Sequence, residues 1–448
     1  MADLSLQARL LTALSSTDKQ AIRADFNHHH PADIAKAMVS QPDAAIAKLL
    51  QLLPLPDQTD LFSYLAKRQQ AALVEELPRN DMAALVSAMD ADERADLFHS
   101  LGDQQRIAIL PGLAHAERED IRRLCSYPER TAGALMTSSY ATLSANLTVK
   151  QAIRTLRLEA PDKETIYQAY VLTEDRRLLG TISLKQLILS PSDVMISSLM
   201  KTEVVAVATD LAQEQVVEKV RQYDLIALPV LDDNNQLVGI ISYDDAMDAA
   251  EEEATDDAQK SASVASMRSP LSQASISELY RKRIGWLVLL VFGALLSGAG
   301  LAFFEDTLEA HIALVFFMPL LVGSGGNAGS QAAALMVRAL ATGDVVLKDW
   351  FRVLAKDLLV ASALGISMGI TVFALGYVRS GPEIAIVVAL AMVCVVLVGS
   401  FIGLSLPFIL SRFKLDPATA SGPLVTTIVD ASGVIIYFGF ATWILQIN

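Results

Sequence analysis

The C-terminal part of the chain consists of long apolar stretches separated by short charged loops. Four stretches contain no Lys, Arg, Asp or Glu and a fifth contains a single one; they are 284–304, 310–337, 358–378, 384–411 and 417–448. They hold 21, 28, 21, 28 and 32 residues, whereas about 20 helical residues cross the hydrocarbon core of a bilayer. The pattern therefore predicts a transmembrane domain of five helices over residues 280–448.

The loops between these stretches differ in charge. The segment before the first stretch and two of the connecting loops are cationic, and their Lys and Arg residues are Arg281, Lys282, Arg283, Arg338, Lys348, Arg352, Lys356, Arg412 and Lys414. Cationic loops stay in the cytoplasm, so we expect the N-terminal half to be cytoplasmic and Asn448 to lie outside. No cleavable signal pattern opens the chain, so the first stretch is expected to act as an uncleaved signal.

Residues 1–130 are typical of short amphipathic helices, with boundaries at the Leu-Pro pairs 53–54, 77–78 and 110–111. The segment 57–65 recurs in weaker form at 93–101, 36 residues later. Because a period in the thirties is typical of stacked helical hairpins, we predict an all-α superhelical domain. His28, His29 and His30 suggest zinc, but they lack Cys partners and precede a helix start at Pro31, which favours a solvated turn.

Residues 131–250 contain a second duplication, with β-type patterning. Ala134-Leu-Met136 returns as Ser198-Leu-Met200, and Leu179-Gly-Thr-Ile-Ser183 returns as Val238-Gly-Ile-Ile-Ser242. Each copy follows the order strand, helix, strand, turn, strand, helix. These residues resemble a tandem pair of CBS (cystathionine-β-synthase) domains, at 131–192 and 193–250. The resemblance implies an α/β pair that stacks into a disc and senses adenosine nucleotides or ions.

An acidic segment joins this pair to the first apolar stretch. Residues 243–257 hold eight carboxylates, are rich in Ala and lack Gly and Pro, so a helix is expected. Asp245, Asp248, Glu252 and Asp256 share one face of it, where like charges cost roughly 0.2–0.5 kcal/mol per pair. A divalent cation would reverse this repulsion, and the alternative is a solvated acidic linker. We assign 243–275 to this connecting helix and a joint, with a Ser-rich flexible part at 268–277.

The negative charge of the chain is concentrated before residue 280. Residues 1–279 carry 26 Lys+Arg and 41 Asp+Glu, a net charge of −15, whereas residues 280–448 carry 10 and 9. This acidity disfavours nucleic acid or anionic lipid as a partner and suits a cation-binding surface. Cys125 and Cys394 lie in different halves and cannot form a disulfide framework, which indicates a reducing compartment.

Asp430 is the single charged residue of the last apolar stretch. A carboxylate at membrane depth costs several kcal/mol unless it faces water, protein or a cation, so it marks a functional ion site by default. The alternative is an Asp that hydrogen-bonds to a neighbouring helix. Gly422, Thr426 and Asp430 are four residues apart, so they are expected to share one helix face.

The second stretch contains a related polar pattern. Gly325 and Gly329 form a small-xxx-small pair that lets helices pack closely, and Asn327 and Gln331 share a face. Pro319 and, if it lies inside the helix, Pro423 would each free a backbone carbonyl. Candidate ligands that are all oxygen atoms suit Mg²⁺, Mn²⁺ or Ca²⁺ rather than softer metals. One carboxylate per chain is sparse, and a twofold homodimer would supply two.

These motifs resemble those of the MgtE family of magnesium channels and transporters. The resemblance rests on Gly325-Gly-Asn-Ala-Gly-Ser-Gln331, on Asp416-Pro-Ala followed by Gly422-Pro-Leu-Val-Thr-Thr-Ile-Val-Asp430, and on Glu253-Ala-Thr-Asp-Asp257. It implies a homodimer with one pore, lined by the second and fifth membrane helices. Asp430 would select Mg²⁺, assisted by Thr426, and the pore lining would include Asn327, Gln331, Gly325, Gly329, Pro423 and Gly422. Some members have Asn where this chain has Gly422, so a side-chain ligand is absent there.

The resemblance also implies regulation by cytosolic Mg²⁺. The connecting helix would act as a plug that Mg²⁺ holds shut by bridging acidic residues. The matching positions are Asp224, Asp245, Asp248, Glu253, Asp256, Asp257 and Asp416, with Asp90 and Asp92 as candidates in the N-terminal domain. ATP binding to the second CBS copy occurs in the family, and Mn²⁺ or Ca²⁺ could substitute for Mg²⁺.

We therefore expect a Mg²⁺-selective, Mg²⁺-gated importer in the inner membrane of a bacterium, and not an enzyme. A proton- or sodium-coupled divalent-cation transporter that uses Asp430 as a carrier site is the first alternative. A membrane-anchored nucleotide sensor without transport is the second. The chain has no GxxxxGK[ST] motif, which fits the absence of direct coupling to ATP hydrolysis.

Overall fold

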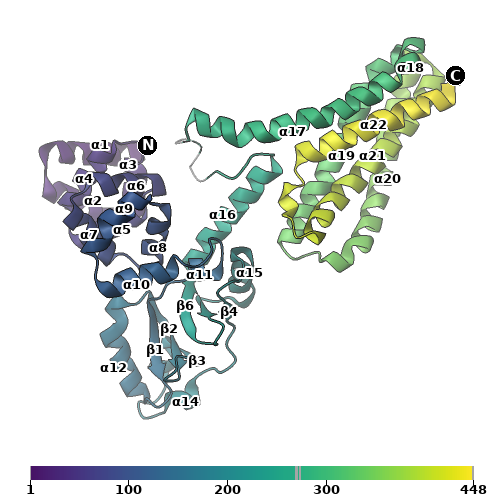
Figure 1. Cartoon of the computed structure of the whole chain (residues 1–448). Helices are drawn as coiled ribbons and strands as arrows, with labels where there is room; N and C mark the ends of the chain where they lie inside the picture. Colours follow the sequence, from purple (N-terminus) through teal and green to yellow (C-terminus); the bar gives the residue numbers. More distant parts are fainter. Residues whose placement is uncertain (1, 268–270, 272–273, 446–448) are drawn as a thin grey trace. The chain divides into compact units, whose positions relative to one another are not determined.

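The computed structural model describes residues 2–267, 271 and 274–445. They form two compact units, Met1–Glu251 and Glu252–Asn448, whose boundary falls inside helix α16 (Tyr243–Ser261) (Figure 1). Half of the predicted Ser-rich joint at 268–277 falls outside the described residues, and so does Asn448.

The first unit begins with the predicted helical domain. Its helices are α1 Ala2–Ser16, α2 Lys19–His28, α3 Pro31–Met38, α4 Asp43–Leu52, α5 Leu55–Ser63, α6 Lys67–Glu76, α7 Arg79–Ala88, α8 Ala91–Ser100, α9 Asp103–Ile109 and α10 His115–Leu124. Pro54 and Pro78 directly precede α5 and α7, as the Leu-Pro pairs predict. One apolar core runs through these helices, with Leu49, Phe62 and Leu85 fully buried.

The three consecutive histidines form a helix boundary. His28 ends α2, and His30 is the N-cap of α3, where its Nδ1 accepts a hydrogen bond from the Ala32 N–H at 3.2 Å. The Nδ1 of His29 lies 2.9 Å from the Asp25 carbonyl oxygen. These contacts agree with the predicted turn between two helices.

The duplicated segment forms two similar α/β layers, as predicted for a CBS pair. Its elements are α11 Ala132–Leu135, β1 Tyr140–Ser144, α12 Val149–Glu159, β2 Thr165–Leu172, β3 Leu178–Ser183, α13 Leu184–Leu189, α14 Ile196–Leu199, β4 Val207–Ala208, α15 Gln213–Tyr223, β5 Ala227–Leu231 and β6 Leu237–Ser242. In each copy the first two strands pair in parallel and the last two are antiparallel. The two copies are joined directly, because the Tyr140 hydroxyl donates to the Leu237 carbonyl at 2.7 Å.

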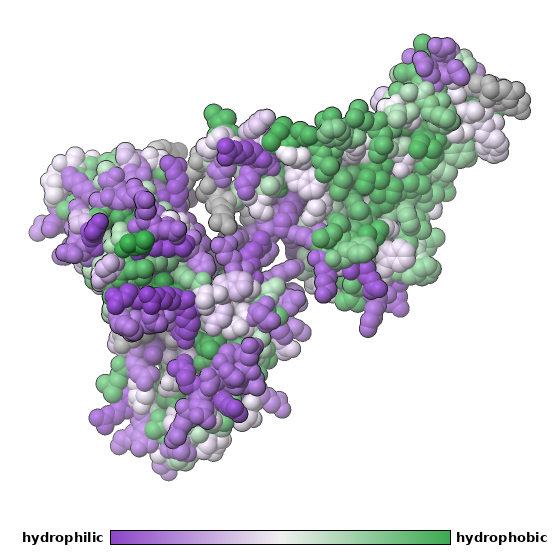
Figure 2. Space-filling model, viewed as in Figure 1, coloured by the Kyte–Doolittle hydropathy of each residue, from purple (hydrophilic) through white to green (hydrophobic). Residues whose placement is uncertain are grey.

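The second unit contains the five predicted spans. They are α17 Ile276–Phe303, α19 Ala313–Ala341, α20 Trp350–Ser380, α21 Pro382–Arg412 and α22 Gly422–Leu445, with the short α18 Glu305–Ala310 after α17. Apolar side chains such as Leu287 and Phe292 are more than half exposed on α17, and this unit presents a largely hydrophobic surface (Figure 2). Such a surface fits a lipid environment.

The start of the fifth span differs from the one predicted by charge. Residues 417–419 form a separate short 3₁₀ turn, so α22 starts at Gly422 and not at Pro417. Pro423 is consequently the second residue of α22, where no helical N–H bond is lost, and it does not free the Thr419 carbonyl. Pro319 lies inside α19 as expected, where proline removes one helix hydrogen bond.

Candidate functional site

Asp430 lies two turns into α22 and faces α19. Its Oδ1 is buried and has no hydrogen-bond partner among the described residues. Gly326 on α19 lies beside it: a Cβ at that position would be in ordinary contact with this oxygen at 3.5 Å, whereas it would stand only 2.8 Å from Thr426 Cγ2, so the glycine makes room for Thr426. An unpartnered buried carboxylate oxygen is costly, which argues against an Asp retained only to hydrogen-bond a neighbouring helix.

Helix α19 presents three different faces to its surroundings. Gly325 and Gly329 are buried against α21, where a Cβ at Gly325 would stand 2.3 Å from Val395 Cγ1 and one at Gly329 would stand 2.9 Å from the Gly399 carbonyl oxygen. Gly325 and Gly329 therefore serve close helix packing in this structure, which differs from the expectation that they line a pore.

The polar face of α19 is exposed in the single chain. Asn327 and Gln331 lie on it together, as their spacing predicts. Neither amide forms a hydrogen bond with the part of the chain that the structure describes. At bilayer depth such amides need water, an ion or another protein surface.

Oxygen atoms of α22 and α19 meet on the third face. The Thr426 hydroxyl donates to the Gly422 carbonyl at 2.8 Å, and Asp430 follows one turn later. Ser330 of α19 completes the group, with its Oγ 3.1 Å from Thr426 Oγ1 and 3.3 Å from the Gly422 carbonyl oxygen. Gly422, Thr426 and Asp430 share a face as predicted, whereas the sequence analysis did not single out Ser330.

The end of α16 contacts the segment just before α22 within the second unit. Lys260 Nζ lies 2.8 Å from Asp256 Oδ2 and 2.5 Å from Asp416 Oδ2. Ser263 Oγ and Ser421 Oγ are 2.6 Å apart in a buried contact. Burial, and next the Asp416 carboxylate, raise the pKa of Asp257. Glu253, Asp256, Asp257 and Asp416 therefore lie in one region, together with a lysine that the charge pattern did not indicate.

A second acidic group, here called the α8 cluster, lies inside the first unit. It consists of Asp90 and Asp92 at the start of α8, Glu164 just before β2, and Asp244 and Asp245 in the first turn of α16. Glu164 feels repulsion from the other four carboxylates. Its Oε2 and the Asp92 Oδ1 are buried without a hydrogen-bond partner among the described residues.

Burial is the main cause that raises the pKa of the carboxyl groups in this region. The pKa reaches about 6 for Asp92, about 7 for Asp245 and about 8 for Glu164. Neighbouring Glu93, which accepts a hydrogen bond from the Ser63 hydroxyl at 2.6 Å, has its pKa raised to about 7. Near neutral pH, the folded chain therefore holds negative charge here at a cost that a cation could offset.

The remaining expected regulatory residues are more dispersed. Asp224 is the exposed C-cap of α15 in the left-handed conformation (φ 49°), and its side chain makes no hydrogen bond or ion pair with described residues. The pKa of Asp248 is raised by burial and next by Asp244. Among the described residues, no three His, Cys, Asp or Glu side chains have the geometry of a metal site.

The α8 cluster makes the stability of the first unit depend on pH. Carboxyl groups titrate near pH 4 when unfolded, so the folded state binds more protons than the unfolded state between about pH 4 and the raised pKa of about 8 for Glu164. Stability should therefore increase as pH falls through this window. Hydrogen-exchange protection factors of α8, measured on the full-length protein in detergent without divalent cations, should be higher near pH 6 than near pH 8.

The same experiment has a matched variant. Glu164→Gln should flatten this pH dependence, and Mg²⁺ should protect α8 of the unmodified chain more near pH 8 than near pH 6. Protection that rises with pH in the metal-free protein would contradict the assignment.

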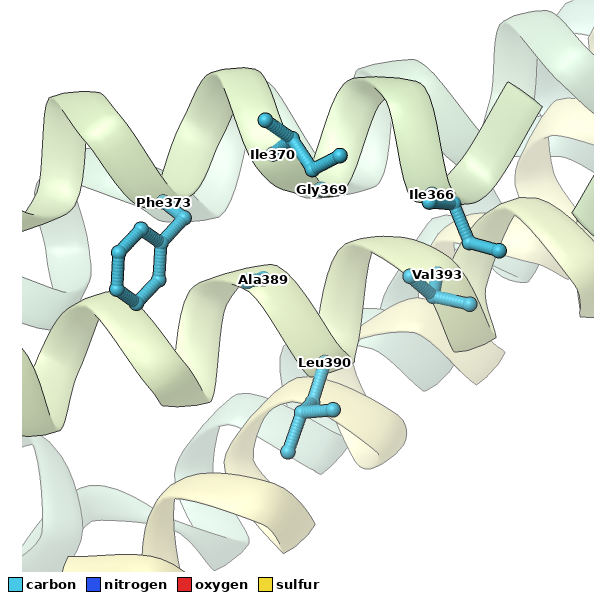
Figure 3. Close-up of a pocket in the computed structure, with 7 residues that line it drawn as sticks. All are labelled: Ile366, Gly369, Ile370, Phe373, Ala389, Leu390 and Val393. Carbon is cyan, nitrogen blue, oxygen red and sulfur yellow. The ribbon is translucent and has the colours of Figure 1, made fainter. Parts of the chain in front are cut away.

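An apolar groove lies elsewhere in the second unit, between α20 and α21. It has a volume of about 260 Å³ and is lined by Ile366, Gly369, Ile370, Phe373, Ala389, Leu390 and Val393 (Figure 3). None of these side chains offers an oxygen ligand, so the groove does not suit a cation.

Family comparisons match the chain in successive segments. Residues 29–130 match the MgtE intracellular N domain, residues 132–193 and 196–252 match CBS domains, and residues 318–440 match the MgtE family described as divalent cation transporters. These segments follow the order of the helical domain, the α/β pair and the membrane helices.

Curated relatives cover most of the chain. A magnesium transporter MgtE of Bacillus subtilis is 31% identical over 435 residues, which is 97% of this chain and 96% of the relative. One of Thermus thermophilus is 39% identical over 329 residues, 73% of each chain.

Two solved structures are similar to the N-terminal half. The soluble part of a magnesium transporter has a TM-score of 0.53 and 29% identity, and covers 56% of this chain and 99% of its own. The cytosolic domain of the Mg²⁺ channel MgtE in complex with ATP has a TM-score of 0.52 and 32% identity, and covers 54% and 99%. By segment order, by identity along nearly its whole length and by architecture, this chain belongs to the MgtE family of magnesium transporters.

Proposed function

We propose that the protein imports Mg²⁺ across the inner membrane of a bacterium through a Mg²⁺-selective pore that cytosolic Mg²⁺ closes. The observation that carries the proposal is the unpartnered Asp430 oxygen between α22 and α19, next to the hydroxyl groups of Thr426 and Ser330. The membrane potential would drive entry with roughly twice 2.3 kcal/mol per 100 mV for a dication. Mg²⁺ uptake into liposomes that contain the purified protein tests the function directly.

The oxygen groups support a hydrated ion as the permeating species. Mg²⁺ gives up its water reluctantly and is usually held by one or two carboxylates with several waters retained. One carboxylate and two hydroxyls on two helices suit such an ion, because water molecules of the hydration shell donate to oxygen acceptors. Mn²⁺ or Ca²⁺ is expected to bind at the same place.

A twofold homodimer would complete the pore. The exposed amides of Asn327 and Gln331 support this arrangement, since a second copy of α19 could face them across an aqueous path. Two Asp430 carboxylates across the axis would balance one dication. Disulfide crosslinking between copies that carry Asn327→Cys tests the dimer.

Closure would use both acidic regions. In the first unit, Mg²⁺ would offset the repulsion within the α8 cluster, with its first coordination shell largely water. In the second unit, Mg²⁺ would hold the end of α16, which carries Glu253, Asp256 and Asp257, near Asp416 in the segment before α22. Asp248 and the exposed Asp224 would contribute to the field that attracts the ion. When cytosolic Mg²⁺ falls, these carboxylates repel one another and the contact is released.

Lys260 should make part of this closure independent of Mg²⁺. Partly exposed ion pairs contribute about 0.2–1 kcal/mol, so Lys260→Ala and Asp416→Ala should each raise the Mg²⁺ concentration needed for half-closure, by up to about fivefold. Patch-clamp currents at varied internal Mg²⁺ measure this midpoint.

A double-mutant cycle provides the control for the Lys260 experiment. If the two residues act through one contact, the double variant should shift the midpoint by less than the sum of the single shifts. Unchanged midpoints in both single variants would contradict a role of this pair in closure.

The CBS pair supports nucleotide binding as a further regulatory input. A related cytosolic domain was solved in complex with ATP, and we propose that ATP binds to the second copy here. Calorimetric titration of the full-length protein with ATP tests this, and the absence of heat above dilution would exclude it.

A further inference from the structure

We infer that Ser330 is a specificity-determining residue of the ion path, where its hydroxyl oxygen accepts a hydrogen bond from the water shell of the passing divalent cation. This inference rests on the proposed function and adds a residue on α19 to the oxygen groups of α22. Ser330 is half-buried, as are Thr426 and Asp430, so a hydrated ion could reach the site.

Both hydroxyl hydrogens around Ser330 have an acceptor within the protein. The Gly422 carbonyl oxygen has two lone pairs and lies within reach of two hydroxyls, Thr426 Oγ1 at 2.8 Å and Ser330 Oγ at 3.3 Å. Each hydroxyl has one hydrogen to donate and two lone pairs. When both hydrogens are directed at this carbonyl, the hydroxyl oxygens present only lone pairs to their other neighbours.

Lone pairs are what the outer surface of a hydrated cation requires. The water molecules around Mg²⁺ turn their hydrogens outward, so favourable partners are acceptors such as hydroxyl oxygens and the Asp430 carboxylate. Ser330 and Thr426 are 3.1 Å apart, and Asp430 lies one turn beyond Thr426, so together they form a continuous row of acceptors. Because its oxygens are held at a fixed spacing, this row would distinguish cations by the size and order of their hydration shells.

The geometry also explains why α19 supplies this oxygen. Residue 422 has no side chain, and a Cβ there would stand 3.6 Å from Ser330 Oγ and 3.9 Å from Ser330 Cβ. The Ser330 hydroxyl therefore occupies the space beside Gly422 into which a side chain of α22 would project. Both distances are ordinary contacts, so a small side chain at 422 fits beside Ser330 or beside its Ala variant.

The first test measures ion selectivity in reconstituted full-length protein. Ser330→Ala should lower the permeability ratio of Mg²⁺ to Na⁺ severalfold, while the internal Mg²⁺ concentration for half-closure stays unchanged. Ser330→Thr keeps the hydroxyl and should retain the ratio. Ser324→Ala is the matched control, because the Ser324 hydroxyl donates to Leu320 of its own helix at 2.6 Å, and it should also retain the ratio.

A relocation experiment separates the ion-path role from a packing role. Gly422→Ser in the Ser330→Ala background returns a hydroxyl to the same space from α22, and it should restore most of the lost selectivity. A residue that only packs α19 against α22 would not be replaced by a hydroxyl from the other helix. Normal selectivity in Ser330→Ala, or a loss that the relocated hydroxyl does not repair, would overturn the inference.

Asp430→Asn in the same preparation distinguishes two failures. If Asp430→Asn loses selectivity and Ser330→Ala does not, the role of Ser330 is refuted and the proposed function stands. If Asp430→Asn conducts Mg²⁺ with normal selectivity, the proposed function fails and the inference fails with it.

Discussion

Asp430→Asn should reduce Mg²⁺ flux by roughly tenfold or more and weaken the discrimination of Mg²⁺ against monovalent cations. Two unit charges 4 Å apart interact by about 4 kcal/mol at an effective dielectric constant of 20, and a dication doubles this value. Since about 1.4 kcal/mol corresponds to a tenfold change, even a fraction of the interaction accounts for the loss. Fluorescence measurement of Mg²⁺ entry into proteoliposomes gives the flux, and bi-ionic reversal potentials give the selectivity.

Asp357→Asn is the matched control for the Asp430 variant. Asp357 lies on α20, directly before the charge-free part of that helix, and its Oδ2 is likewise buried without a hydrogen-bond partner among the described residues. It is remote in the chain from the oxygen groups of α19 and α22, and α20 packs mainly on α21. Flux should survive this change, whereas unaltered flux and selectivity in Asp430→Asn would remove the basis of the pore assignment.

Neutralising Glu253, Asp256 and Asp257 together, by Gln and Asn substitutions, should leave the pore conducting at millimolar internal Mg²⁺. The variant removes the carboxylates that a cation would bridge at the end of α16. It also removes one of the two carboxylates bound to Lys260, so the Mg²⁺-independent part of closure is weakened as well. Inside-out patch recordings at increasing internal Mg²⁺ report the open probability.

A triple variant with the same charge change controls for net charge. Glu174, Asp175 and Glu203 are exposed residues of the CBS pair, and their substitution by Gln, Asn and Gln should leave closure nearly normal. If the α16 variant closes like the unmodified protein, the end of α16 does not hold the pore shut.

The sequence was sufficient for the architecture because each element carries a strong local signal. Five long stretches almost without charge predict membrane helices. The duplicated Leu-Met and Gly-containing motifs locate equivalent elements in the two copies of the α/β pair. The 3₁₀ turn at Pro417–Thr419 was missed because those residues are as apolar as the helix that follows. Hydropathy does not show where a helix begins inside an apolar stretch.

The candidate sites were only partly predictable, because periodicity does not identify the neighbour that each helix face contacts. Spacing placed Thr426 and Asp430 together, yet it could not tell that Gly325 and Gly329 face α21 while Ser330 faces Gly422. Glu164 stands just before a strand without any repeating pattern, and its burial next to Asp92 depends on tertiary contacts. Lys260 directly follows an acidic segment, where one positive charge scarcely changes the charge pattern, so the sequence did not indicate its ion pairs.

The most direct test of the account is a recording of Mg²⁺ currents from the purified protein in planar bilayers while internal Mg²⁺ is raised from micromolar to millimolar and no proton or sodium gradient is imposed. We predict unitary currents at low internal Mg²⁺ that vanish as internal Mg²⁺ rises and that Asp430→Asn strongly reduces. Mg²⁺ movement that requires a proton or sodium gradient, without unitary currents, would contradict the channel account and favour a coupled transporter.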